Sequence, residues 1–329
     1  MDSSTLSETP SGRARDLVRG GYDVHVHIAP DVMTRRIDDL DLAARYRELG
    51  LDGFVIKSHY VPTAERAAVV RKAVPGVDAV GAITLNASVG GVNPIAVEVL
   101  ARGGGRFVWL PTVDSSNQRS CLAETPEGAT PPMWAQLQQD LADAGMAAPA
   151  AEVLDADGAP NANLRHVLDV MARHDMTLAT GHLSADESAA VVPVARTAGV
   201  RRIVVTHPEF TSQKMGADLQ KELAVHGGLL ERCLTTPLTK KVPWDTWLGN
   251  IRAAGAENSV ISTDLGQPFN PPVEDGLPIA ADILLGNGFS EEEVRVMIVH
   301  NSRFLAGAEP LEDAPQSVRD RYGEKVSVS

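Results

Sequence analysis

Two histidines, His25 and His27, end the first apolar segment of the chain and are its leading candidates for chemistry. They stand in the run Gly21-Tyr-Asp-Val-His-Val-His-Ile-Ala-Pro-Asp31. Side chains alternate across a β-strand, so both imidazoles are predicted to project from one face while Val24 and Val26 pack on the other. Two imidazoles on one face form half of a metal site, although a His-x-His motif alone also fits two ordinary half-buried histidines.

Three further apolar segments end in a histidine or an aspartate. The endings are Thr180-Gly-His182, Val205-Thr-His207-Pro-Glu209 and Ser262-Thr-Asp264. In barrels of parallel strands the active site lies at the carboxyl ends of the strands, so four imidazoles and one carboxylate are expected to meet at one rim. This set of donors suits one or two divalent ions, with zinc preferred and manganese or iron as alternatives.

The elements that would position these residues alternate between strands and helices. Apolar and β-branched runs predict eight strands, the number that closes a (β/α)8 TIM barrel of the α/β class, over 22–28, 53–57, 79–85, 106–111, 176–181, 202–206, 228–234 and 259–263. Amphipathic stretches predict helices over 38–49, 63–74, 93–102, 132–144, 161–174, 185–198, 215–226 and 244–253, with a last one over 291–305. Ser184 and Thr63 are predicted N-caps, and Gly50, Gly199 and Gly227 are predicted helix stops.

The barrel is expected to occupy residues 19–306 as one domain. Residues 1–18 are predicted to form a flexible N-terminal tail and residues 307–329 a C-terminal tail. The segment 148–160 is predicted to be an extra hairpin or excursion before the fifth strand.

Composition narrows the class of protein. The chain has 329 residues, a formal net charge of −13 and no basic stripe, which argues against nucleic acid or an anionic membrane as partner. Its two cysteines, Cys121 and Cys233, lie far apart and suggest neither a disulfide framework nor a thiolate zinc site. No apolar run approaches the roughly 20 residues of a membrane span, and no signal-peptide pattern precedes the first strand. A cytoplasmic protein acting on a small molecule is expected, with homo-oligomers formed through the outer helices and the C-terminal tail.

The order and spacing of these motifs resemble the amidohydrolase superfamily of metal-dependent hydrolases. The resemblance spans about residues 20–306 and includes the closing segment His300-Asn-Ser-Arg-Phe-Leu-Ala-Gly. It implies a metal centre formed by His25, His27, His182, His207 and Asp264.

The chain departs from the superfamily at the fourth strand. Many binuclear relatives carry a carboxylated lysine or a glutamate there as a bridge between two ions, whereas Phe107-Val-Trp-Leu-Pro111 offers no bridging group. Lys57 and His59 instead end the second strand. Lys57 is interpreted as a displaced carboxylated bridge, as a cation for a substrate carboxylate or phosphate, or as a partner in a structural ion pair. His59 is interpreted as a further ligand, an oxyanion-stabilising donor or a structural residue.

Substrate contacts are predicted in three loops. Arg35 and Arg36 follow the first strand and could bind an anionic group in bidentate fashion, or remain solvated loop charges. Asn86 begins a small, polar loop after the third strand. Gln267 lies in the proline-stiffened loop after the eighth.

The expected reaction is hydrolysis by a metal-activated water of a C–N bond in an amide, lactam, cyclic imide or amidine, or of an ester or lactone. Asp264 is the predicted general base, and His59 or Lys57 is predicted to stabilise the oxyanion. The main alternative is nonhydrolytic decarboxylation of an unsaturated or aromatic acid. A phosphoesterase and a noncatalytic barrel scaffold are weaker alternatives.

Overall fold

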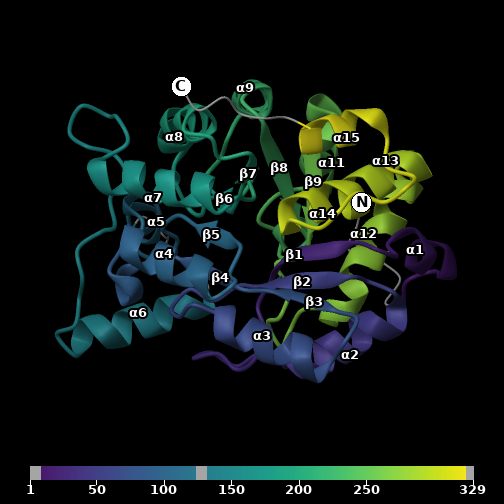
Figure 1. Ribbon diagram of the computed structural model, residues 1–329, viewed down its shortest axis with the longest axis horizontal. Helices are drawn as coiled ribbons and strands as arrows, with labels where there is room; N and C mark the ends of the chain where they lie inside the picture. Colours follow the sequence, from purple (N-terminus) through teal and green to yellow (C-terminus); the bar gives the residue numbers. More distant parts are fainter. Residues whose placement is uncertain (1–8, 124–131, 324–329) are drawn as a thin grey trace.

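The computed structural model describes residues 9–123 and 132–323, in which nine β-strands alternate with helices (Figure 1). Every strand pairing is parallel, in one sheet of order β1-β2-β3 and another of order β4-β5-β6-β7-β8-β9. The strands are β1 (Tyr22–Val26), β2 (Gly53–Ile56), β3 (Asp78–Val80), β4 (Ala82–Thr84), β5 (Phe107–Trp109), β6 (Thr177–Ala179), β7 (Arg202–Val205), β8 (Gly228–Cys233) and β9 (Ser259–Ser262). The predicted parallel α/β class is confirmed.

The predicted third strand is divided at Gly81 into β3 and β4. The backbone amide of Arg106 donates to the Gly81 carbonyl oxygen at 2.9 Å. A Cβ added at Gly81 would lie 2.5 Å from Cα of Ala64, the first residue of α3. Only glycine permits this approach of two backbones. The last strand of the first sheet, β3, and the first strand of the second sheet, β4, therefore follow each other directly along the chain. The pairing is interrupted at Gly81, where the start of α3 packs against the backbone.

The first and last strands also contact each other. Val26 forms an isolated parallel bridge with Leu265. The amide of His27 donates to the Leu265 carbonyl at 2.8 Å, and the amide of Asp264 donates to the His25 carbonyl at 2.8 Å. These bonds bring the segment that follows β9 against the end of β1, so the first and last predicted site residues are neighbours in space.

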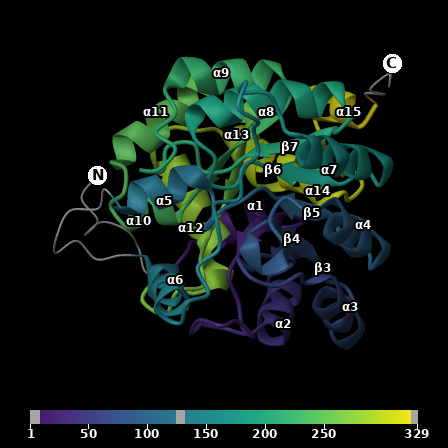
Figure 2. The ribbon, with the colours of Figure 1, turned by 90° about the vertical axis from the view of Figure 1, so that its left-hand side faces the viewer.

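Helices surround the strands on all sides, as Figure 2 shows. The helices between strands are α2 (Asp39–Leu49), α3 (Ala64–Ala73), α4 (Pro94–Arg102), α5 (Ser116–Ala123), α6 (Met133–Asp143), α7 (Ala162–Arg173), α8 (Ala185–Thr197), α9 (Ala217–Val225), α10 (Thr235–Leu238) and α11 (Trp244–Ala254). The others are α1 (Gly12–Leu17), α12 (Val273–Gly286), α13 (Glu291–Arg295), α14 (Asn301–Ala306) and α15 (Gln316–Gly323). None of the helices in the described ranges has the length and apolarity needed to cross a membrane.

The predicted caps behave differently at two positions. Ser184 forms a full capping box with Glu187 at the start of α8. Thr63 precedes α3 but caps no helical amide, because its hydroxyl donates to the Ile56 carbonyl at 2.8 Å. Gly50 ends α2 in the left-handed conformation, with a φ of 75°, as a glycine stop requires.

Apolar side chains form one cluster among the strands and two between strands and helices. The cluster among the strands contains Tyr22, Val24, Val55, Val80, Ala82, Phe107, Trp109, Ala179, Val204, Leu229, Val260, Phe304, Leu305 and Ala306. All nine strands, together with α14, contribute to it, so the strands of both sheets share one core.

The prediction that Val24 and Val26 share a face is wrong. Val24 belongs to the cluster among the strands, whereas Val26 packs with helical side chains such as Leu42 and Leu277. The pairing of β1 with β2 shifts register between Asp23 and Val26. This bulge resets the alternation, because an irregular residue turns the following side chains to the other face.

Three segments differ from the prediction, each in its own way. Helix α12 was not predicted, since it contains Gly276 and Pro278. A Cβ at Gly276 would lie 2.5 Å from the Thr263 side chain, so close packing against the segment that follows β9 explains the glycine. The predicted last helix is three consecutive segments, α13, a π-helical turn over Val296–His300 and α14. Residues 148–160 contain no named strand and only an isolated antiparallel bridge between Leu154 and Pro160.

Both predicted tails contain a helix packed on the domain. Helix α1 buries Ala14 and Leu17 and contacts α12, so residues 12–17 are not a free tail. Helix α15 buries Val318 and contacts α14. The remaining parts of these predictions, residues 1–8 and 324–329, lie outside the described residues.

Candidate metal centre

The predicted ligands follow, or lie at, the carboxyl ends of four strands. His25 is in β1, His182 follows β6, His207 follows β7 and Asp264 follows β9. All of these histidines are buried, and the Asp264 side chain is 19% exposed. One cavity of about 670 Å³ is lined by His27, Lys57, His59, His182, His207 and Asp264, among others. The structure therefore brings these predicted residues to one place.

Asp264 is the point on which the first-strand histidines converge. Nε2 of His25 and Nε2 of His27 each lie 3.1 Å from Oδ1 of Asp264. The hydroxyl of Thr235 donates to the other carboxylate oxygen at 3.1 Å. The backbone of Asp264 has a φ of 52°, a left-handed conformation that is uncommon for a residue with a side chain. One oxygen is thus held by a threonine and the other faces the imidazoles.

His182 and His207 complete the group of imidazoles. Their ring centroids are 5.1 Å apart, and that of His207 is 6.1 Å from that of His25. Nδ1 of His207 lies 3.2 Å from the Gln213 amide oxygen, whereas the buried Nδ1 of His182 has no hydrogen-bond partner in the described chain. Burial lowers the pKa of His207 to about 4 and the pKa of His182 well below its ordinary value. Both rings are therefore neutral at pH 7 and keep a nitrogen lone pair.

Lys57 lies beside the first imidazole and forms no ion pair within residues 9–123 and 132–323. Its Nζ is 2.8 Å from Nε2 of His25 and 5.2 Å from the ring centroid of Trp109. Trp109 is on β5, the strand that lacks a bridging group. Burial lowers the pKa of Lys57, although Asp264 and Glu231 oppose this shift. A lysine so placed gives up part of its preference for the charged form.

His59 packs on the same group. Its ring stacks on His27 with a centroid separation of 5.0 Å and an interplanar angle of 28°. Its Nδ1 lies 2.9 Å from the Thr112 hydroxyl oxygen. Burial lowers the pKa of His59 well below its ordinary value, so the ring is neutral. It lines the cavity with its orientation fixed by Thr112.

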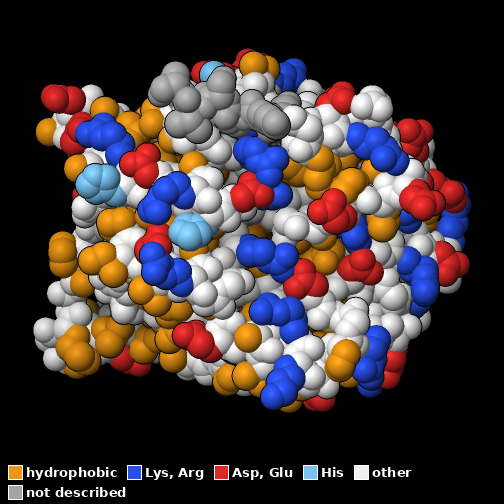
Figure 3. Space-filling view, viewed as in Figure 1, with side chains coloured by type: hydrophobic (Ala, Val, Ile, Leu, Met, Phe, Trp, Pro, Cys, Tyr) orange, Lys and Arg blue, Asp and Glu red, His pale blue; other side chains and the backbone are white. Residues whose placement is uncertain are grey.

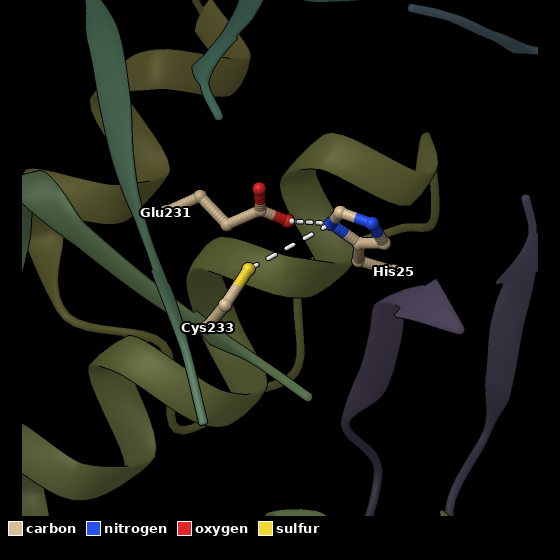
Figure 4. A group of neighbouring side chains, drawn as sticks. All are labelled: His25, Glu231 and Cys233. Atoms are coloured by element: carbon tan, nitrogen blue, oxygen red, sulfur yellow. Dashed lines mark hydrogen bonds and ion pairs between the residues drawn. The ribbon is translucent and has the colours of Figure 1, made fainter. Parts of the chain in front are cut away.

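Glu231 on β8 is a site residue that the sequence did not reveal. Its Oε1 lies 3.1 Å from Nδ1 of His25, as Figure 4 shows, and accepts from the Ser262 hydroxyl at 2.9 Å. Its Oε2 accepts from the backbone amide of His207 at 3.3 Å. Cys233, two residues along the same strand, places Sγ 3.7 Å from Nδ1 of His25. The only available signal was a carboxylate two positions before a cysteine inside an otherwise buried strand.

Of the four predicted substrate contacts, Arg35 and Gln267 line the cavity, whereas Arg36 and Asn86 do not. Arg36 instead donates through Nη1 to the carbonyl oxygens of Pro268 at 3.0 Å and Asn270 at 2.9 Å. It therefore fastens the loop after β9 and, unlike its neighbour Arg35, does not belong to the described lining, so the structure does not place it at the cavity as predicted.

Asn86 is also a structural residue. It is fully buried and absent from the cavity lining. Its amide nitrogen donates to the His59 carbonyl at 2.9 Å and to the Thr112 hydroxyl at 2.8 Å, and its amide oxygen accepts from the Thr112 amide at 2.8 Å. Asn86 thus supports the residues that orient His59 and has no polar atom left for a substrate.

The charges around His25 and Asp264 favour a cation between them. Burial and Lys57 lower the pKa of His25, but Asp264 and Glu231 raise it by more, so that the net shift is upward. Burial alone would raise the pKa of Asp264, yet His25 and His27 hold it well below its ordinary value. Asp264 is therefore ionised, and the nitrogens that face it are held near a negative charge.

The residues fit a divalent ion at three points and resist it at one. Two Nε2 atoms converge on one carboxylate oxygen, Glu231 is placed to accept a hydrogen bond from Nδ1 of His25, and the buried Nδ1 of His182 lacks a partner among the described residues. In contrast, Arg35 lies with Nη2 3.3 Å from Nδ1 of His27. A guanidinium can only donate, so neutral His27 carries its proton on Nε2. Binding of an ion through that nitrogen requires the contact with Arg35 to change.

Several solved structures share this fold at low sequence identity. An amidohydrolase from Pseudomonas aeruginosa is 13% identical with a TM-score of 0.55, covering 94% of this chain and 99% of its own. The probable dipeptidase PvdM from the same organism is 11% identical with a TM-score of 0.56, covering 94% and 98%. A probable 2-pyrone-4,6-dicarboxylic acid hydrolase from Acinetobacter baumannii is 11% identical with a TM-score of 0.52, covering 88% and 99%.

These similarities confirm the predicted resemblance to the amidohydrolase superfamily at the level of the fold. No curated protein matches the chain by sequence. A family model described as a family of unknown function, DUF6282, matches residues 20–231, more than half of the chain and the part that carries four of the five predicted ligands. The chain belongs to this family of unknown function.

Proposed function

We propose that the protein is a metal-dependent hydrolase of the amidohydrolase type, built on a closed eight-stranded barrel. The observation that carries the proposal is the convergence of His25 and His27 on one oxygen of Asp264, beside His182 and His207. The bond proposed to be hydrolysed is a C–N bond of an amide, lactam, cyclic imide or amidine, or the ester bond of an ester or lactone, in a small molecule.

The residues proposed to hold the ion are His25, His27, His182, His207 and Asp264, and imidazole with carboxylate is a donor set that zinc accepts. A divalent ion bound there supplies Lewis acidity toward a carbonyl oxygen and lowers the pKa of a bound water.

Asp264 is the proposed general base. Its Oδ2 accepts from Thr235 and its Oδ1 lies against His25 and His27. These imidazoles hold the pKa of Asp264 well below the ordinary value, so the carboxylate that lines the cavity is ionised. It takes the proton of the attacking water and returns it to the leaving group. Lys57 and His59, both in the lining, are the donors proposed to stabilise the oxyanion.

Lys57 also decides between one ion and two. If its Nζ is carboxylated, it gains two oxygens that can bridge a second ion, which Phe107-Val-Trp-Leu-Pro111 cannot do. If it stays an amine, its position against His25 and Trp109 supports a single ion with a neighbouring hydrogen-bond donor. Intact-protein mass spectrometry at neutral pH distinguishes the two, because carboxylation adds the mass of carbon dioxide.

The test combines metal stoichiometry with isotope incorporation. Chelator-treated protein is reloaded with Zn²⁺ or Mn²⁺ and incubated with amides, lactams, cyclic imides and esters in ¹⁸O-labelled water. The proposal predicts turnover that requires the metal and a product that carries one labelled oxygen. His207→Ala should lose metal and turnover together, whereas the control His166→Ala, on the exposed face of α7, should keep both.

Two outcomes would contradict the proposal. Stoichiometric metal with carbon dioxide release and no label would assign the decarboxylase reaction instead. Failure of the chelated protein to take up either metal would remove the basis for both reactions.

A further inference from the structure

The cavity at the metal centre has a charge opposite to that of the whole protein. The chain carries 43 acidic and 30 basic side chains. Among the described residues that line the cavity, however, one carboxylate, Asp264, stands with four basic side chains: Arg35, Lys57, Lys214 and Lys241. Asp264 is itself committed to the imidazoles. The remaining charge of the described lining is positive, and such a cleft concentrates anions.

Two of the cations, Lys214 and Lys241, lie at the mouth. Lys214 follows His207 in the loop before α9, and Lys241 follows α10. Both are exposed, and neither forms an ion pair with any residue of the described chain. Arg35 differs, because Asp31 and His27 hold its Nε and Nη2. The mouth lysines are thus free to bind a group that enters from solvent.

An apolar wall accompanies these cations. Phe269 also lines the cavity and is 71% exposed, an unusual exposure for an aromatic side chain. Arg36 bonds to the carbonyls on both sides of it, at Pro268 and Asn270, so the loop that presents Phe269 is held in place. Phe210, deeper in the lining, has its ring centroid 5.0 Å from that of His207. The lining therefore offers aromatic surface both at the exposed Phe269 and beside His207.

We infer that the ligand of this cavity is an organic carboxylate with an apolar body. Its carboxylate binds Lys214 and Lys241 at the mouth, and its body packs on Phe269 and Phe210. The bond to be cleaved then lies at the far end, beside Asp264. The position of the cleaved bond rests on the proposed hydrolase function, whereas the preference for a carboxylate with an apolar body does not.

The test compares an acid with its neutral analogue. Isothermal titration calorimetry on the zinc-loaded protein measures binding of 3-phenylpropionate and of 3-phenylpropanol, which share a body and differ in charge. The acid should bind roughly tenfold more tightly, the ratio that corresponds to about 1.4 kcal/mol. Raising the salt concentration should reduce this ratio, since the lysines are exposed.

Substitutions show where the carboxylate binds. The double variant Lys214→Gln/Lys241→Gln should bring the ratio to below about threefold. The matched control Lys240→Gln should leave it unchanged, because Lys240 is exposed next to Lys241 but does not line the cavity. Phe269→Ala should weaken both ligands equally, since the apolar contact does not depend on charge.

The possible failures are distinguishable. If the acid preference survives the double lysine variant, the carboxylate binds elsewhere, for example at the metal, and the inference is wrong. If neutral and anionic esters are hydrolysed with equal kcat/KM and the lysine variant changes neither, the inference fails while the hydrolase stands. If the acid preference behaves as expected but no compound is turned over, the proposed function fails and the inference stands.

Discussion

At the amino ends of the strands, three aspartates meet four arginines, whereas at the carboxyl ends one aspartate meets a group of imidazoles and a lysine. We call the first group the amino-end cluster; its members are Asp52, Asp78, Asp175, Arg106, Arg201, Arg202 and Arg303. We call the second the carboxyl-end cluster; its members are His25, His27, Lys57, His59, His182, His207 and Asp264. Charged surface residues of both signs are mixed elsewhere, as on the face in Figure 3.

The amino-end cluster is closed by ion pairs and backbone contacts. Arg106 pairs with Asp78 at 2.5 Å, and Arg202 pairs with Asp175 at 2.6 Å. Helix α14 covers this end, where the Arg202 Nε donates to the Phe304 carbonyl at 2.7 Å and the Thr177 hydroxyl donates to the Leu305 carbonyl at 2.6 Å. Each charge has a partner that satisfies it, so this end can stabilise the fold but offers no reactive group.

The carboxyl-end cluster is left open. Burial keeps His59, His182 and His207, which line the cavity, neutral, and the four basic side chains of the described lining outnumber its single carboxylate. In barrels of this kind, residues at the carboxyl ends of strands serve chemistry and those at the amino ends serve stability. The comparison predicts that substitutions in the carboxyl-end cluster lower activity with little effect on stability, and that substitutions in the amino-end cluster lower stability with little effect on activity.

The largest effect is expected for Asp264→Asn. The variant keeps the shape of the side chain but removes the proton acceptor, so turnover should fall by about 10²–10⁴-fold. Metal content, measured by mass spectrometry of the eluted ions, should stay largely intact, and circular dichroism should show the native fold. The exposed control Asp218→Asn on α9 should keep full turnover. Wild-type activity in Asp264→Asn would exclude this residue as the base.

The next effect is expected at the other end, for Arg202→Met. This substitution removes the guanidinium donors of two carbonyl oxygens, the buried one of Phe304, which keeps only the Gly307 amide, and the part-buried one of Asp175, at a cost of about 1–3 kcal/mol each. Urea denaturation should therefore show a loss of about 2–4 kcal/mol, with turnover per folded molecule unchanged. The control Arg102→Met, whose side chain is 76% exposed, should cost less than about 1 kcal/mol. A variant as stable as wild type but inactive would break the separation.

The sequence predicted the carboxyl-end cluster well because a polar residue that ends an apolar run is easy to recognise. His25, His182, His207 and Asp264 all follow this pattern, and the parallel order of strands brings such ends together. Glu231 was missed because it lies inside a buried strand, where only the position of β8 across from β1 reveals its contact with His25.

The loops were predicted less well, since a loop sequence does not encode the direction of its side chains. Arg35 and Arg36 are neighbours, yet one lines the cavity and the other fastens the loop of Phe269. Asn86 has the composition of a ligand-binding loop residue, but its partners come from two other segments. The bulge that separates Val24 from Val26 likewise depends on pairing with β2.

A smaller effect is expected for Glu231→Gln. The carboxylate accepts from His25, Ser262 and the His207 amide, and an amide nitrogen in place of one oxygen would face one of these donors. Residues that orient a metal ligand typically change metal affinity by about 10–100-fold. Competition with a chelator should show a weaker Zn²⁺ affinity in this range. The exposed control Glu222→Gln on α9 should not change the Zn²⁺ affinity. An unchanged affinity in Glu231→Gln would show that Glu231 only stabilises the fold, as the residues of the amino-end cluster do.

The smallest effect is expected for Asp175→Asn, in the amino-end cluster. Burial alone would raise the pKa of Asp175, but Arg201 and Arg202 lower it. Because the pKa is lower in the folded state, the stabilisation is present above the ordinary value of 3.8 and is lost as the pH falls through the folded pKa. The side chain is 46% exposed, so the loss at pH 7 should be less than about 1 kcal/mol.

Urea midpoints of the variant and wild type should differ from about pH 5 to pH 8 and converge below the folded pKa. Such a variant should keep wild-type turnover across this range, since no charge at the amino ends reaches the cavity; a shifted pH profile of activity would show that the two ends are coupled.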